Sequence, residues 1–349
     1  MKETMKERCR QIAFITLALA FFVVPWVVPA WCGKEFIWVR NYAPGVAVIT
    51  GIIFAVTVGN PFAKITGKLS SLLLGWAIVL MGFGMNLNKV LAAGAHGFIY
   101  TFIGITLGLG LGYIFGRLFK VEKNCSWLVS VGTSICGGSA IAAAAPAIKA
   151  KDSDVALASA TVFTLNAVAL MIFPYIGHAL NFTETQFGYF AALAIHDTSS
   201  VVGASLQYGS TALEVGTTVK LARALWIVPV TLFLASFVAE KASGEKSKFK
   251  LKVPWFIPWF IVAAAVMTYL PMLFTEGSQV VTVLKGTGGL LKEISKYLMI
   301  FTLFMIGANL SRQKLRTLGI RPLLHGVVLW LILSVIWCLA IYFKLVNAA

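Results

Sequence analysis

The chain has little charge for its length. Of its 349 residues, 12% are charged and 59% are hydrophobic, and its mean hydropathy is +0.86, whereas soluble domains carry roughly 25% charged residues. Apolar runs of about 20 residues recur from end to end, and each is long enough to cross ~30 Å of hydrocarbon as a helix. The composition therefore excludes an ordinary soluble domain and indicates a polytopic membrane protein.

Motifs for metal binding, disulfide bonding and nucleotide hydrolysis are missing too. The five cysteines are scattered without a CxxC pair, so neither a disulfide framework nor a metal site is expected. The Gly67–Lys68 pair is followed by leucine and lacks the upstream glycine of a phosphate-binding loop. No stretch between apolar runs exceeds about 25 residues, which leaves no room for a nucleotide-hydrolysing domain. We expect a protein that is not an enzyme, holds no cofactor or metal, and draws on gradients for any work.

Eleven apolar segments are expected to lie in the membrane. Lipid offers the backbone no hydrogen-bonding partner, so each lipid-facing span must be helical, and the segments are continuous rather than alternating like barrel strands. They are Ile12–Pro29, Pro44–Val58, Leu69–Leu87, Phe98–Phe115, Ser126–Ile148, Asp154–Ile176, Phe187–Tyr208, Val219–Ala239, Pro254–Leu273, Ile294–Leu310 and Leu323–Phe343. The predicted fold is an all-α membrane protein with about 10–11 transmembrane segments in a single transporter domain over 1–349.

Positive charge is unevenly distributed between the loops. With a cytoplasmic N-terminus and eleven crossings, 18 of the 29 Lys and Arg residues fall inside, nine fall outside, and Lys220 and Arg223 lie in a span. Residues 240–253 and 311–322 hold the largest inside groups. This is the positive-inside pattern, so the net charge of +16 indicates topology, and no nucleic-acid partner is expected.

Two distant stretches resemble each other. IVLMGFGMNLNKV (78–90) and FTLFMIGANLSRQKL (301–315) both contain Gly-x-Asn-Leu after an apolar run, and His-Gly opens the next run. Either a duplication produced them, or Gly and Asn simply cap apolar helices. In the predicted topology the two runs point in opposite directions, as in the inverted repeats of secondary transporters. The first half would be 1–180 and the second 181–349.

Each half contains one interrupted segment, at 126–148 and 187–208. In TSICGGSAIAAAAP, Gly137 and Gly138 weaken a helix and Ser139 can cap a following one; in AIHDTSSVVGAS, Asp197, Thr198 or Ser199 can cap similarly. Backbone breaks at membrane depth are tolerated where they line a cavity, and helix N-termini attract anions. We therefore predict two discontinuous helices, crossing or re-entrant, that share a substrate cavity; the alternative is surface loops between interfacial helices.

Several ionisable or polar residues accompany these segments. Lys220 and Arg223 either balance the charge of an anionic substrate or extend to the outer interface, and Arg223 is also the natural partner of Asp197. His196 titrates near neutrality and can carry a coupling proton, while Asp197 either joins it in coupling or only caps a helix. Asn166 either faces the cavity or links helices.

The candidate site follows from these patterns. Neutral donors suit an anion that must be released, so the interrupted segments supply most of the site. The predicted substrate-binding residues are Ser134, Cys136, Gly137, Gly138, Ser139, Thr198, Ser199, Ser200, Lys220 and Arg223; the predicted coupling residues are His196 and Asp197; Asn166 is a further polar residue of the cavity.

Three motifs in combination carry a family resemblance. CGGSAIAAAAP, the His-Asp-Thr of AIHDTSSVVGAS, and KLARALWIVP (220–229) resemble the sulfate exporter family, also called the YeiH family, of bacterial inner-membrane proteins. The resemblance runs from the second span to the GANL span. It implies a secondary transporter in a bacterial inner membrane that moves sulfate, sulfite or a sulfonate outward. The family often has Glu where this chain has Asp197.

Two other classes of function fit the same residues. A cation/proton antiporter would use Asp197 as its ion-binding carboxylate, with H⁺ or Na⁺ as the ion. A non-transporting membrane sensor or anchor is disfavoured because no extramembrane domain is expected. An intramembrane enzyme with a Cys136–His196 nucleophile–base pair is disfavoured because small residues around both are explained by helix packing. The expected partners are thus a small anion, a coupling H⁺ or Na⁺, and membrane lipid.

Overall fold

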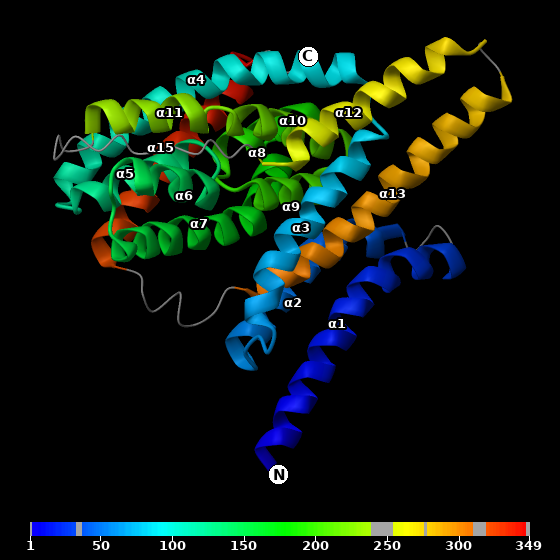
Figure 1. Cartoon of the computed structure of the whole chain (residues 1–349), viewed down its shortest axis with the longest axis horizontal. Helices are drawn as coiled ribbons and strands as arrows, with labels where there is room; N and C mark the ends of the chain where they lie inside the picture. The colour runs from blue at the N-terminus through cyan, green and yellow to red at the C-terminus, as the bar shows by residue number, and fades with distance from the viewer. Residues whose placement is uncertain (1, 33–36, 239–253, 276–277, 310–318, 347–349) are drawn as a thin grey trace. The chain divides into compact units, whose positions relative to one another are not determined.

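The computed structural model describes residues 2–32, 37–238, 254–275, 278–309 and 319–346 (Figure 1). Every regular element in these ranges is a helix, so the all-α prediction is confirmed for them. The basic segments 239–253 and 310–318, which carry much of the predicted charge asymmetry, lie outside the described residues.

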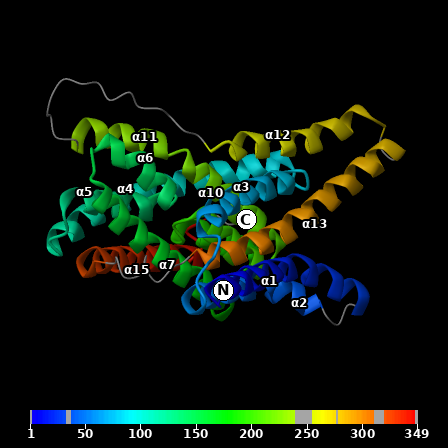
Figure 2. The same cartoon turned by 60° about the horizontal axis from the view of Figure 1, so that its bottom comes forward.

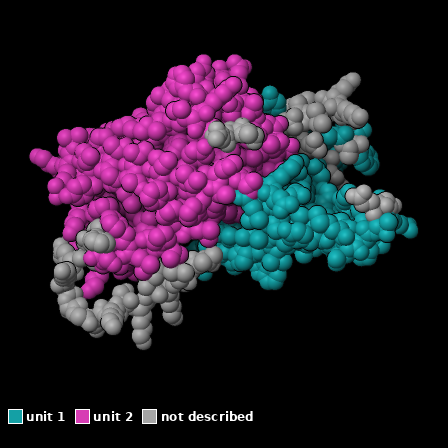
Figure 3. All heavy atoms as spheres, turned by 90° about the horizontal axis from the view of Figure 1, so that it is seen from above, with its two compact units in different colours: residues 1–91, 254–313 teal, residues 92–253, 314–349 magenta. Residues whose placement is uncertain are grey.

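The chain forms two compact units, which Figure 3 colours separately. Unit 1 (1–91 and 254–313) holds α1 (Lys2–Cys32), α2 (Ile37–Thr57), α3 (Ala63–Gly82), α12 (Phe256–Tyr269), η3 (Leu270–Leu273) and α13 (Gln279–Ala308). Unit 2 (92–253 and 314–349) holds most of α4 (Leu87–Leu118), then α5 (Lys123–Ser134), α6 (Gly138–Ala147), α7 (Asp152–Ala179), α8 (Glu184–Ala194), α9 (Thr198–Tyr208), α10 (Ser210–Ala224), α11 (Ile227–Phe233), η2 (Leu234–Val238) and α15 (Ile320–Tyr342). The predicted halves divide the chain elsewhere, at residue 180, and stay a prediction.

Membrane-compatible helices occur in both units. Among the described residues, seven helical stretches are long and apolar enough to cross a bilayer: Glu7–Pro29, Ala63–Gly82, Leu87–Leu118, Asp152–Ala179, Ser210–Ser236, Phe256–Leu273 and Ile320–Tyr342. Tyr42–Thr57 and Gly138–Ala147 are shorter apolar helices. The polytopic membrane class is thereby confirmed, while the predicted count of ten to eleven spans stays a prediction.

The start of α13 differs from the predicted segment, which began at Ile294. The helix begins at Gln279 because Ser278 caps it, its side chain accepting a hydrogen bond from the Val281 N–H. Lysines and glycines in its first half lower the local hydropathy without breaking the helix. Hydropathy alone therefore located only the second half of this element.

Small residues allow the helices of unit 1 to approach closely. α13 packs along α2 and α3 (Figure 2), and a Cβ on Gly51 or on Gly307 would clash with the backbone of the facing helix. Beyond the end of α13, the Asn309 side-chain oxygen accepts hydrogen bonds from Asn60 at 3.1 Å and from the Thr66 hydroxyl at 2.6 Å. The polar end of the GANL motif thus ties the end of α13 to the turn before α3 and to the first turn of α3.

In unit 2, three glycines of α4, spaced four residues apart, face three serines of α5. The pairs are Gly108 with Ser134, Gly112 with Ser130, and Gly116 with Ser126. Such small-residue seams are typical of close helix packing in membranes. Because α5 also packs against α6, α7 and α15, its C-terminal end is buried inside the unit, and the orphan carbonyls at that end need partners other than water.

Candidate functional site

Two interruptions of helix lie against each other in unit 2. Residues 135–137 separate α5 from α6, and residues 195–197 separate α8 from α9 (Figure 1). The second gap lies 60 positions after the first along the chain. A Cβ placed on Gly137 would lie 3.3 Å from the Cβ of Asp197. Gly137 and Asp197 are the N-cap residues of α6 and α9, so the N-termini of these two helices meet.

Gly137 has a backbone conformation that few other residues adopt. Its φ is +68°, in the region open to glycine. Its N–H donates to the Gly132 carbonyl at 2.9 Å, which closes the last turn of α5. The glycine therefore permits both the turn and the contact with Asp197, and its own amide is already used.

Lys220 of α10 reaches the C-terminal ends of both α5 and α8. Its Nζ donates to the carbonyls of Ile135 at 3.0 Å, Ile195 at 2.7 Å and Ala192 at 3.5 Å. The side chain is 0% exposed. Ile135 and Ile195 are equivalent positions of the two interruptions, so a single ammonium group binds the same carbonyl of each.

Arg223, one helical turn further along α10, repeats this arrangement with its guanidinium. Nε and Nη2 donate to the Ser134 carbonyl at 2.8 and 2.5 Å, and Nη2 also donates to Thr133 at 3.2 Å. Nη1 donates to the carbonyls of Ala192 and Leu193, both at 2.8 Å. The side chain is 2% exposed.

The two cations therefore cap helix C-termini. The last carbonyls of a helix lack intrahelical partners and together carry about half a negative charge. At the C-termini of α5 and α8, the two positive groups of α10 donate hydrogen bonds to these carbonyls. Neither side chain extends to an interface, since both are buried. Among the described side chains, no ion pair joins Arg223 to Asp197, so burial of the cations is balanced by carbonyl groups instead.

Asn166 of α7 holds the second interruption from the other side. Its side-chain oxygen accepts from the His196 N–H at 3.0 Å and the Asp197 N–H at 3.2 Å. The residue thus links helices, and it does so at the interruption itself. His196 is 1% exposed, and among the described residues no partner meets full hydrogen-bond geometry at either ring nitrogen, although the ring lies close to the Val162 backbone. Its ring lies edge-on to that of Trp330 of α15, with ring centroids 6.4 Å apart.

The N-termini of α6 and α9 are more exposed than the C-termini of α5 and α8. The Asp197 carboxylate accepts from the Ser199 N–H at 3.1 Å and from the Ser199 hydroxyl, as an N-cap residue should. Asp197, Thr198 and Ser199 are partly exposed, and Ser139 is exposed. The amides of Gly138, Ser139, Thr198 and Ser200 have no partner within the described chain. Ser200 is buried, whereas the other three residues are partly or fully exposed, so donors of both helices face accessible space.

The remaining predicted residues lie around the place where the interruptions 135–137 and 195–197 meet, hereafter the crossing of the interrupted segments. Ser134 contributes its carbonyl to Arg223, but its hydroxyl points to Gly108 of α4 and has no partner. Cys136 is a buried free thiol within the first interruption, and Ser200 is buried in the first turn of α9. Within the described ranges, no group of three or more His, Cys, Asp or Glu side chains is arranged to hold a metal ion.

The groups that sequence reasoning missed are backbone carbonyls. Ile135, Ala192, Leu193 and Ile195 contribute oxygen atoms, and no side-chain type announces that role. The available signal was the spacing of Lys220 and Arg223, which places both cations on one face of a helix.

The long apolar helices, with buried polar groups where the two interruptions meet, define a polytopic membrane protein. Comparison with known sequences assigns the family: the chain belongs to the family described as Conserved hypothetical protein 698, whose model matches residues 16–326. Similar proteins include the UPF0324 membrane proteins of Bdellovibrio bacteriovorus (48% identical, covering 82% of this chain and 85% of that one) and Bacteroides thetaiotaomicron (46%, 88% of each). A third, from Geobacter sulfurreducens, is 42% identical over 93% of this chain and 94% of its own. No solved structure matches the chain.

Proposed function

We propose that the protein is a secondary transporter of a small anion, which binds between the N-termini of α6 and α9. The observation that carries this proposal is the contact between the two N-caps, Gly137 and Asp197, beside C-termini that Lys220 and Arg223 already cap. Each interrupted segment then acts as one discontinuous membrane helix. The common offset of 60 residues, shared by the helix ends and by the carbonyls that Lys220 binds, is what two similarly built segments would give.

A charge count favours an anion at this crossing. Each helix terminus carries about half an elementary charge, so the two C-termini sum to about −1 and the two N-termini to about +1. Arg223 and a protonated Lys220, whose three N–H groups match the three carbonyls it contacts, add two positive charges, and Asp197 adds one negative charge. The total is about +1 with Asp197 ionised and about +2 with Asp197 protonated.

The donors for the anion come from both helices. The amides of Gly138, Ser139, Thr198 and Ser200, with the hydroxyls of Ser139 and Thr198, would surround an oxyanion with neutral donors. A helix terminus stabilises a charge by ~0.3–2 kcal/mol, so two termini and a few hydrogen bonds give a site of about micromolar to millimolar strength. Such a site releases its substrate readily enough for turnover.

Asp197 supplies the coupling in this mechanism. Its carboxylate occupies the amide and hydroxyl of Ser199 and so competes with a substrate anion for the same positive end. A proton on Asp197 relieves this competition, so proton and anion bind cooperatively and move together. The buried ring of His196, one residue earlier, is the second candidate proton carrier.

The class of substrate that we propose comes from the resemblance to the sulfate exporter family. A sulfur oxyanion, such as sulfate, sulfite or a sulfonate, presents several acceptor oxygens that suit convergent N–H and O–H donors. Export or exchange across the bacterial inner membrane follows from the same resemblance.

Flux in proteoliposomes tests the proposal. Sulfite or sulfate should be transported, and an imposed pH gradient should change the rate. Asp197→Asn keeps the helix cap, since Asn caps as well as Asp, so it should transport the anion without responding to pH. Asp152→Asn, an exposed acid at the start of α7, is the matched control and should behave as wild type. Absence of anion flux together with Na⁺-dependent proton movement would instead identify a cation/proton antiporter.

A further inference from the structure

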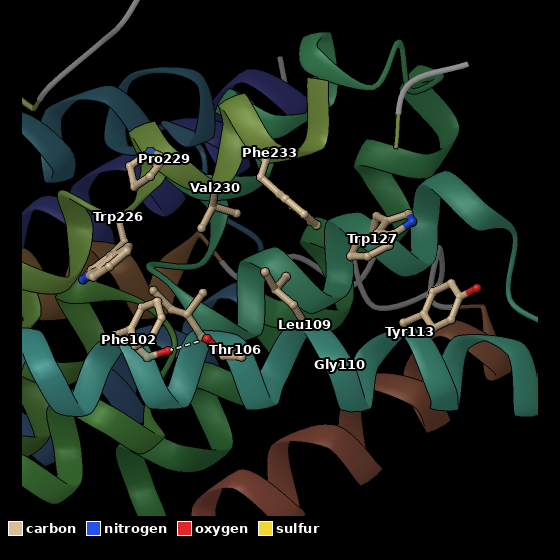
Figure 4. A pocket seen from close by; sticks show the side chains of 11 residues that line it. Phe102, Thr106, Leu109, Gly110, Tyr113, Trp127, Trp226, Pro229, Val230 and Phe233 are labelled. Carbon is tan, nitrogen blue, oxygen red and sulfur yellow. Dashed lines mark hydrogen bonds between the residues drawn. The ribbon is translucent and has the colours of Figure 1, made fainter. Parts of the chain in front are cut away.

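An exposed apolar groove of about 570 Å³ lies between α4 and residues 226–233 (Figure 4). Five of its eleven lining residues are aromatic: Phe102, Tyr113, Trp127, Trp226 and Phe233. The groove belongs entirely to unit 2 and shares no residue with the crossing of the interrupted segments. Its occupant is therefore a separate question from the transported substrate.

The groove has the depth and polarity of a lipid-chain site. Both of its main walls, α4 and the stretch 210–236, are candidate membrane spans. From Phe102 to Tyr113 the groove follows α4 for about 16 Å, close to half of the ~30 Å hydrocarbon core. The Thr106 hydroxyl, near its middle, donates to the Phe102 carbonyl at 2.9 Å (dashed in Figure 4), so this part of the groove is apolar in character.

One end of the groove is positively charged. The exposed Arg117 guanidinium lies 4.4 Å from the centre of the Tyr113 ring, which itself lines the groove. Lys120 and Lys123 follow in the next turn, and the acid between them, Glu122, uses its carboxylate to cap α5. In the predicted topology this turn is cytoplasmic, where the leaflet is rich in anionic lipid.

We infer that the groove binds one phospholipid with an anionic headgroup. One acyl chain lies along the aromatic wall, and the phosphate region sits at Arg117, which Tyr113 holds in place. The positive charge of Arg117 matches the negative charge of the headgroup, and the length of the groove matches the thickness of one leaflet. A lipid seated there would fill the hollow between α4 and α11, the helix that follows the cation-bearing α10.

Quenching by brominated lipid tests the inference. Bromine quenches only tryptophans that it contacts, and the chain has ten, so the difference between wild type and Trp127→Phe isolates the groove signal; Trp226→Phe is a second probe if the first variant does not fold. The vesicles contain phosphatidylcholine and a minor share of phosphatidylglycerol. Bromine on the phosphatidylglycerol should quench this signal about five-fold more, per mole of lipid, than bromine on the phosphatidylcholine. Five-fold corresponds to the ~1 kcal/mol that one basic residue contributes to binding an anionic lipid.

Charge variants decide whether Arg117 causes the preference. Arg117→Gln should remove it, and Arg117→Lys should keep it. Lys89→Gln, at the other end of α4 and also exposed, is the matched control and should leave it unchanged. Equal quenching by both lipids, or a preference that survives Arg117→Gln, overturns the inference. Quenching by neither lipid also overturns it, because protein, such as a second copy of the chain, would then fill the groove.

Discussion

Replacing Arg223 with glutamine removes the guanidinium that joins the ends of α5 and α8. Three buried carbonyls, those of Thr133, Ser134 and Leu193, lose their donor, while Ala192 keeps its 3.5 Å contact with Lys220. Glutamine offers one NH₂ group with two N–H donors, so at least one carbonyl stays without a partner. At ~1–3 kcal/mol for each unsatisfied buried group, the expected loss is at least ~1–3 kcal/mol, a large share of the ~5–15 kcal/mol that keeps a protein folded.

Folded yield and thermal unfolding measure this loss. By size-exclusion chromatography in detergent, Arg223→Gln should give a much smaller monodisperse peak than wild type and should unfold at a lower temperature. Arg223→Lys, which keeps the charge but has three donors in place of five, should fall between them. Arg321→Gln, an exposed arginine at the start of α15, should match wild type.

One result would refute the capping role of Arg223. If Arg223→Gln had wild-type yield and unfolding temperature but bound sulfite more than ten-fold more weakly, the arginine would be a substrate ligand rather than a helix cap. Binding can be followed by the thermal stabilisation that an anion confers through mass action.

Three further substitutions test the neighbouring groups. Gly137→Ala should destabilise the fold by ~1–3 kcal/mol, because alanine is strained at positive φ and its Cβ would press on Asp197; the unfolding temperature should drop and transport should fall with it. Asn166→Ala should cost ~2–6 kcal/mol, because it leaves the amides of His196 and Asp197 unsatisfied, which a low folded yield would reveal. His196→Leu should be neutral or stabilising, because the ring is buried and neither nitrogen makes a hydrogen bond of full geometry within the described residues; a collapse in yield would show a structural role instead, through the nearby Val162 backbone.

Much of the crossing could be anticipated from residue types. The glycine pair and the capping residue Asp197 marked both interruptions, because glycine destabilises a helix and a short polar side chain starts one. The observed interruptions, at residues 135–137 and 195–197, lie inside the predicted segments 126–148 and 187–208. These are local signals, confined to a few consecutive residues.

The role of the cations could not be anticipated in the same way. Their partners are carbonyl groups 25 to 90 positions away in the chain, and every residue type has a carbonyl. Only the tertiary packing that brings α10 against α8 shows which carbonyls lack donors. The lipid groove was likewise hidden, because its aromatic residues come from separate segments that each read as ordinary membrane helix.

The capping by α10 also sets an order of events during synthesis. Ser134 and the arginine that caps it are separated by 89 positions, which a ribosome elongating at 5–20 residues per second takes about 4–18 s to cover. During that interval the end of α5 has been made, but its guanidinium partner has not. The polar interruption must therefore wait in a wet or protein-lined place, and α5 and α6 become fully stable inside lipid only after α10 has arrived.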